Sequence, residues 1–241
     1  MDERPGSGLD PKRFAQGMTY EQYLAYIGTP ENLAREAGWW KGTVRHDFGG
    51  LLRAWASQRR LSAEQAQAIR WLAAQRGGPA KILVISEEWS SDCRRDVPML
   101  ALLAAAGGLE LRIFTRDGDT LGRGPRSDPA ESPNADLVNQ HLNEKDGETY
   151  QSVPVAAFYT RDDELLYRYI EFPALYPKMR LAALLQRPRA GESSKEETWE
   201  RFLHDWGAVQ QGPFFAMWAA ATVDEILTEL YLRVVAGGAH E

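Results

Sequence analysis

The stretch KILVISEEWSSDCRRDVPML, residues 81–100, constrains the fold of this chain more than any other segment. Lys81 to Ser86 form a short apolar, β-branched run without helical periodicity, which predicts a buried strand. From Ser91 the sequence predicts a helix that contains Pro98 and is stopped by Gly107-Gly108. A buried strand followed at once by a helix predicts an α/β sheet in this part of the chain.

The rest of the chain extends this unit in a recognisable order. Residues 109–115 alternate like a strand, and two more strand candidates, 155–159 and 164–171, flank a turn at residues 161–163. Residues 1–17 are predicted to be a loose lead-in. Helices are expected at about 20–27, from 30, at 47–58, 63–75, 91–106 and 133–143, from 177 to about 187, and at 195–207 and 213–235. The order β-α-β-α-β-β-α predicts a mixed sheet with helices on both faces.

Composition limits the class of protein. The chain has 241 residues, enough for one large domain or one domain with additions, and its net charge of −6 argues against nucleic acid as a partner. We find no apolar segment of membrane-spanning length and no secretory pattern, so we expect no membrane association and a cytoplasmic location. Its one cysteine, Cys93, rules out an internal disulfide, and the four histidines lack metal-ligand spacing. We therefore expect no metal and no cofactor.

Three features around the first strand-helix turn point to a known family. Trp89 stands directly before Ser-Ser-Asp-Cys, Pro98 follows Cys93 by five residues, and SVPV places Pro154 just before the late pair of strands. With the element order, this pattern resembles the thioredoxin superfamily over roughly residues 80–188. It is similar to bacterial thioredoxin-like proteins with extra helices and a W-C-x-D-C motif, here degenerate to W-S-S-D-C.

The resemblance implies a thioredoxin-like fold, with a mixed four-to-five-stranded sheet, helices on both faces and added N- and C-terminal helices. It divides the chain into an N-terminal helical extension (1–78), a thioredoxin-like domain (79–188) and a C-terminal helical extension (189–241). It also implies a cis peptide bond before Pro154, which would lie against the motif. The two together would form a binding groove with the residues Trp89, Ser91, Asp92, Val153 and Pro154.

The motif itself lacks part of the redox chemistry. A dithiol oxidoreductase needs an exposed first cysteine, activated at the helix N-terminus, and a second one that resolves the mixed disulfide. Here Ser90 holds the first position, and a hydroxyl does not exchange disulfides; Cys93 holds the second. The family often carries a buried acid where this chain has Val84. Cys93 and Ser90 are the candidate catalytic residues, with a protein or a low-molecular-weight thiol or disulfide as the partner.

Each motif residue also has a structural interpretation. Ser90 or Ser91 can cap the helix, and Asp92 complements its dipole. Cys93 is expected to be an inert or slowly reacting thiol, since burial opposes the effect of the neighbouring arginines. Glu87-Glu88 is expected to form a solvated acidic rim, which could select basic partners.

Several functions stay open at this point. The first is a binding protein without redox turnover. The second is a monothiol protein in which Cys93 forms mixed disulfides with glutathione or a partner. The third is a glutathione-transferase-like use of the Ser90 hydroxyl. If Ser90 replaces a cysteine, the parent would be an ordinary thiol-disulfide oxidoreductase.

Tryptophans outside the motif allow two interpretations. They either pack the terminal helices onto the sheet, which we favour because short helices need tertiary burial, or form an aromatic face for a partner or a homodimer. The residues concerned are Trp39, Trp40, Trp55, Trp71, Trp199, Trp206 and Trp218.

Overall fold

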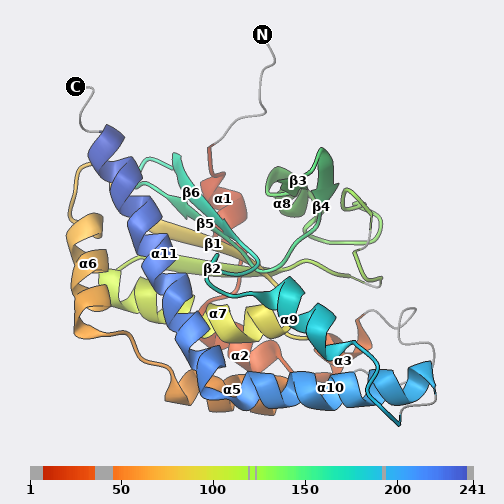
Figure 1. The fold of residues 1–241 in the computed structure, drawn as a ribbon. Coiled ribbons are helices and arrows are strands. Elements are labelled where there is room, and N and C mark those ends of the chain that lie inside the picture. Colours follow the sequence, from red (N-terminus) through yellow and green to blue (C-terminus); the bar gives the residue numbers. More distant parts are fainter. Residues whose placement is uncertain (1–7, 36–45, 119, 123, 192–193, 238–241) are drawn as a thin grey trace.

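The structure is a computed structural model that describes residues 8–35, 46–118, 120–122, 124–191 and 194–237. At its centre lies a four-stranded mixed sheet in the order β2-β1-β5-β6 (Figure 1). The strands are β1 (Lys81–Ser86), β2 (Glu110–Thr115), β5 (Val155–Tyr159) and β6 (Leu165–Ile170). β1 pairs in parallel with β2 and antiparallel with β5, and β5 pairs antiparallel with β6. The predicted mixed α/β sheet is therefore confirmed.

Helices surround this sheet in the predicted order. They are α1 (Pro11–Phe14), α2 (Tyr20–Tyr26), α3 (Pro30–Ala34), α5 (Gly49–Gln58), α6 (Ala63–Ala73), α7 (Ser91–Gly107), α8 (Ala135–Gln140), α9 (Lys178–Leu185), α10 (Lys195–Gln211) and α11 (Pro213–Gly237). The added helices at both ends of the chain match the prediction.

Local sequence signals determine several helix ends. Thr19 and Ser62 each accept a hydrogen bond from the backbone N–H three residues on, and Gln22 and Gln65 bond back to the cap, which completes two capping boxes. Gly108 ends α7 in the left-handed region, with φ 67°, where a side chain would be strained. These contacts bear out the predicted cap at Ser62 and the predicted stop after α7.

The core lies around β1 and α7. Five of the six β1 residues are buried, and α7 contacts β1, β2, α5, α6 and α11. Figure 1 shows α11 crossing one side of the molecule, with α6 beside it. The helices before and after the α/β unit thus pack on the helix that carries the motif, and their apolar faces are buried there.

Two local predictions were wrong. Residues 1–17 are not all a loose lead-in, because Asp10 caps α1 and Gly8 forms an isolated bridge with Glu164. The predicted helix 133–143 is shorter and is followed by a hairpin that was not predicted, β3 (Asn143–Lys145) and β4 (Glu148–Tyr150).

Some of the tryptophans outside the motif pack in the interior, and others are exposed at the surface. Trp55 and Trp218 are buried in a second apolar cluster with Tyr176 and Phe215. Half of the side chain of Trp71 and of Trp199 is exposed instead, at 48% and 53%. Trp39-Trp40 lies outside the described residues. Among those that are described, no helix has the length and apolar character needed to cross a bilayer.

Candidate functional site

The site is built on the turn between β1 and α7. Ser90 occupies the N-cap position, where its N–H donates to the Glu87 carbonyl at 3.0 Å and its carbonyl accepts from the Arg94 N–H at 3.1 Å. The Ser90 side chain forms no hydrogen bond to the helix backbone. The predicted hydrogen bond from the helix backbone to the Ser90 hydroxyl is therefore not formed. Ser90 still occupies the first position of the motif.

Cys93 lies in the first turn of α7, with only 1% of its surface exposed. The backbone N–H of Glu87 donates to its Sγ at 3.3 Å. Burial raises the pKa of the Cys93 thiol to about 12, although the hydroxyls of Ser86 and Ser90 and the Glu87 N–H favour the thiolate. Because the thiolate is the reactive form, burial disfavours the reactive form of this sulfur.

The Val153–Pro154 segment faces this turn. The Val153–Pro154 peptide bond is cis. It leads into β5, where Val155 pairs with Ile85 at the end of β1, so that Val153 lies beside the β1–α7 turn. On the other side, the Pro154 carbonyl accepts a hydrogen bond from the N–H of Glu171 at 2.8 Å.

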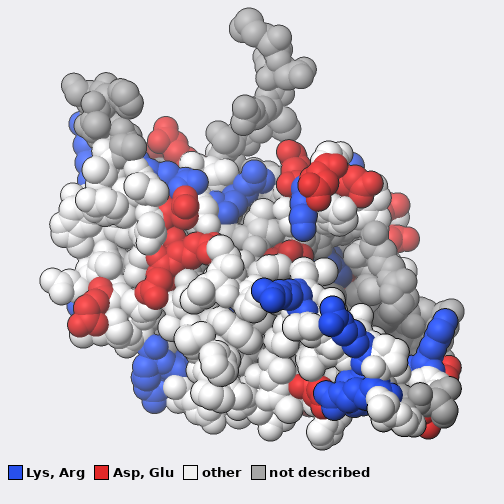
Figure 2. All heavy atoms as spheres, in the orientation of Figure 1, with Lys and Arg blue, Asp and Glu red and all other residues white. Residues whose placement is uncertain are grey.

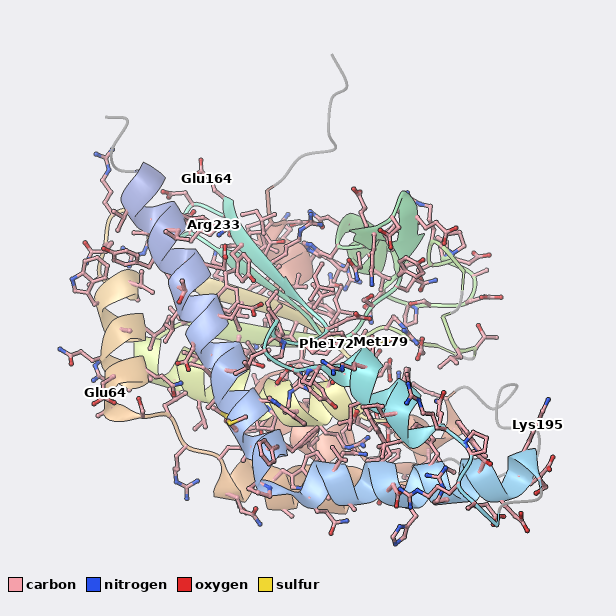
Figure 3. All side chains as sticks on the ribbon, in the orientation of Figure 1. Glu64, Glu164, Phe172, Met179, Lys195 and Arg233 are labelled. Carbon is pink, nitrogen blue, oxygen red and sulfur yellow. The ribbon has the colours of Figure 1, made fainter. Side chains whose placement is uncertain are left out.

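A groove of about 470 Å³ opens between these two segments. It is lined by Trp89, Ser90, Arg116, Gly122, Gly124, Pro125, Glu148, Thr149, Tyr150, Gln151, Ser152, Val153, Glu171 and Lys178. Figure 2 shows acidic side chains gathered over the β3–β4 hairpin and basic ones over α9, two elements that each contribute residues to this groove. The groove therefore combines the predicted turn with the hairpin that sequence reasoning missed.

Of the residues predicted from the sequence, Trp89, Ser90 and Val153 line the groove, whereas Ser91, Asp92 and Pro154 do not. Asp92 is fully buried instead: its carboxylate accepts from Arg95 Nη1 at 2.8 Å and pairs with Lys178. The expectation that Asp92 forms part of the binding surface is corrected. Its role is to anchor α7 to the start of α9.

Arg95 and Asp96 extend this anchor into the core. Arg95 pairs with Asp96 through Nη2 at 2.6 Å and Nε at 2.8 Å. The side chains of Asp92, Arg95 and Asp96 are all fully buried. The Asp96 carboxylate also accepts from the Tyr169 hydroxyl at 2.8 Å and from the Thr222 hydroxyl at 2.9 Å. The network therefore joins α7 to β6 and α11, and it fixes the helix whose first turn borders the groove.

The sequence predicted that Glu87 and Glu88 form a solvated acidic rim, and this prediction is wrong. Glu87 and Glu88 are 0% and 1% exposed. The Arg35 guanidinium pairs with them at 2.7 and 3.4 Å, and the Asp117 N–H donates to Glu87 Oε1 at 2.8 Å. Burial raises the pKa of Glu87, and the neighbouring Arg35 opposes this shift. These carboxylates hold the turn in place, and their burial keeps them away from any other protein at the surface.

Sequence reasoning also missed Arg116, which connects Trp89 to the groove wall. Its guanidinium forms two hydrogen bonds with Asp117, at 2.7 and 3.0 Å, and donates to the Gln151 carbonyl at 2.7 Å. It stacks 5.2 Å from the Trp89 ring, whose Nε1 donates to Asp117 Oδ2 at 3.2 Å. The available signal was positional: Arg116 follows β2, whose end lies beside that of β1 in a parallel pair.

Within the described ranges, no three His, Cys, Asp or Glu side chains are grouped so as to hold an ion. The groups that line the groove are hydroxyls, amides, carboxylates, one guanidinium, one ammonium and aromatic rings.

A β2-β1-β5-β6 sheet, with a helix starting at the WSSDC turn and a cis proline facing it, defines a protein of the thioredoxin-like class. A family model described as thioredoxin matches residues 50–121, which include β1, α7 and β2. Over these residues the chain is similar to the thioredoxin family.

Two solved structures are similar to this chain. One is a protein of unknown function from Pseudomonas aeruginosa, with 15% identity, a TM-score of 0.48 and coverage of 93% of this chain and 95% of the other. The second is an HIV epitope-scaffold, with 14% identity, a TM-score of 0.46 and coverage of 91% and 96%. Comparison with curated proteins gave no significant match.

Proposed function

We propose that this chain is a thioredoxin-like binding protein without dithiol redox turnover. Its ligand is an extended segment of a partner protein, or a low-molecular-weight thiol or disulfide, held between the Ser90 turn and Val153–Pro154. The observation that carries this proposal is the state of Cys93, the chain's one cysteine: it is buried, and its pKa is raised to about 12. Serine stands where a dithiol enzyme needs its exposed nucleophile.

The groove supports the binding half of the proposal. Among the described residues, the N–H and C=O of Val153 form no hydrogen bond, although the chain pairs as a strand from Val155 onward. An extended peptide can pair with such main-chain groups and place its side chains in the adjoining groove. Trp89 and Tyr150, which is 43% exposed, offer aromatic surface on the groove walls.

Insulin reduction in the presence of a dithiol reductant tests the absence of redox turnover. We expect the rate with the purified chain to equal that of the reductant alone. Turnover clearly above this background would contradict the proposal and would favour a thiol-disulfide oxidoreductase.

One observation favours a second candidate. Ser90 lines the groove and its hydroxyl is not used as a helix cap, so that donation to a ligand sulfur, in the manner of some glutathione transferases, would need it to exchange only its contact with the Cys93 sulfur. Retention on immobilised glutathione that is lost in Ser90→Ala, together with conjugation of an electrophile, would support this candidate over the first.

A further inference from the structure

The charges that line the groove are not balanced. Two cations line it, Arg116 and Lys178, but each pairs with a fully or almost fully buried carboxylate behind it, Asp117 and Asp92. These two ion pairs are formally neutral. A ligand in the groove therefore meets little net positive charge from either of them.

Two carboxylates in the groove have no such partner. Neither Glu148 nor Glu171 forms an ion pair with any residue of the described chain. Glu148 lies on β4 and accepts only the hydroxyl of Tyr150, at 2.9 Å. The unmatched formal charge of the groove lining is thus negative, and it comes from two separate walls.

Glu171 is held in an unusual position. Its backbone has φ 67°, a left-handed conformation that costs free energy for a residue with a side chain. Its N–H donates to the Pro154 carbonyl, and its own carbonyl accepts from Arg95 Nη2 at 3.4 Å. These contacts keep Glu171 at the groove, beside the cis peptide bond.

A third acceptor lies in the wall of the same groove. Gln151 is 7% exposed and lines the groove, and its Nε2 donates to the carbonyls of Gly124 and Arg126 at 3.0 and 2.9 Å. Those two bonds fix the orientation of the amide, and they leave its buried Oε1 without a hydrogen-bond partner. Oε1 lies close to Gly122, which also lines the groove. A Cβ atom added to Gly122 would lie 2.6 Å from this oxygen.

From this arrangement of acceptors we infer that the groove is selective for a cationic group, and that the bound partner segment carries a Lys or Arg side chain between Glu148 and Glu171. The inference rests on the proposed function, since it specifies the ligand of the same groove. A guanidinium offers several N–H donors to these oxygens, whereas a neutral isostere offers no charge.

A pair of synthetic peptides tests this inference on the full chain. Both are fluorescein-labelled extended nonapeptides of alternating Ala and Val, with Arg at the central position in one and its neutral analogue citrulline in the other. We expect the Arg peptide to bind about tenfold more tightly at low salt, and this ratio to shrink at high salt.

Three variants locate the effect. Glu148→Gln and Glu171→Gln should each weaken binding of the Arg peptide by about threefold to fivefold and leave the citrulline peptide unchanged. Glu144→Gln is the matched control, because Glu144 is on the same hairpin but does not line the groove. It should change the affinity of neither peptide.

The outcomes separate the two levels of the proposal. If both peptides bind with equal affinity and Val153→Pro abolishes the binding of both, the inference about charge is overturned and the proposed binding function is supported. If neither peptide binds, both the inference and the proposed peptide-binding function are overturned. An Arg preference that all three variants leave intact would place the cation elsewhere and would also overturn the inference.

Discussion

The backbone N–H of Glu87 donates a hydrogen bond to the sulfur of Cys93 at 3.3 Å, and the side chain of the same glutamate is held by Arg35. The turn before α7 is thus closed over the sulfur from the β1 side. This contact lies inside the protein, where only 1% of the cysteine surface is exposed. The one cysteine of the chain therefore acts as a packed core residue.

Ser90→Cys should restore a redox motif. Ser90 and Cys93 occupy the N-cap and the third residue of α7, the spacing of the family's dithiol motif. We expect the oxidised variant to contain an intramolecular disulfide, seen as a mass lower by two hydrogen atoms and as the absence of free thiol. It should also reduce insulin in the presence of a dithiol reductant.

Ser91→Cys is the control for this variant, because the neighbouring position lacks the spacing of the motif. We expect it to keep both thiols reduced under the same conditions. Failure of Ser90→Cys to form the disulfide would contradict the geometry of the turn.

Arg95→Met should strongly destabilise the fold. Removal of the guanidinium leaves Asp92 and Asp96 fully buried, with Lys178 as the remaining cationic partner, and breaking a buried ion pair costs about 3–5 kcal/mol. Chemical denaturation measures the loss.

Arg112→Met is the matched control, since its pair with Glu110 is partly exposed, at 23% and 47%, and should contribute less than about 1 kcal/mol. The double variant Arg95→Met/Asp96→Asn should recover part of the stability, because it also removes one buried charge. Equal effects of the two single arginine variants would show that the buried network does not anchor α7.

His141 should make the fold acid-sensitive. It is 2% exposed and hydrogen-bonded to the Tyr159 hydroxyl at 3.1 Å, and burial lowers its pKa to about 4. Between pH 6.5 and 4 the unfolded chain binds a proton that the folded chain does not, so stability falls as the pH falls, by about 3 kcal/mol. Urea denaturation at several pH values measures this slope.

His141→Gln should flatten the dependence on pH in this window. His204→Gln, at a side chain that is 83% exposed, should leave it unchanged. Equal losses of stability in wild type and His141→Gln between pH 6.5 and 4 would show that His141 is not the group responsible.

The elements of the fold could be predicted where their signals are local. KILVIS marks β1 and Gly108 ends α7 without reference to any other segment. The β3–β4 hairpin was missed although its turn has a local signal, Asp146-Gly147, with φ 54° and 80° as such turns require. The strands beside it are three residues each, too short to show alternation.

The site could be predicted only in part, because its partners come from distant segments. Glu87-Glu88 resembles a solvated pair until Arg35, 52 residues before Glu87, is brought against it. Glu171 and Gln151 reach the groove because the sheet places the Pro154 segment beside β1. No spacing in the sequence encodes these neighbours.

The central claim, that Cys93 is a buried and unreactive thiol, is tested most directly by its rate of reaction with an aromatic disulfide reagent at pH 7.5. The reference is the same chain unfolded in guanidinium chloride. A thiol pKa raised from 9.0 to about 12 lowers the thiolate fraction about 10³-fold, and burial adds a steric barrier. We therefore predict that the folded protein reacts at least about 10³-fold more slowly. A folded-state rate equal to or above that of the unfolded chain would contradict the account.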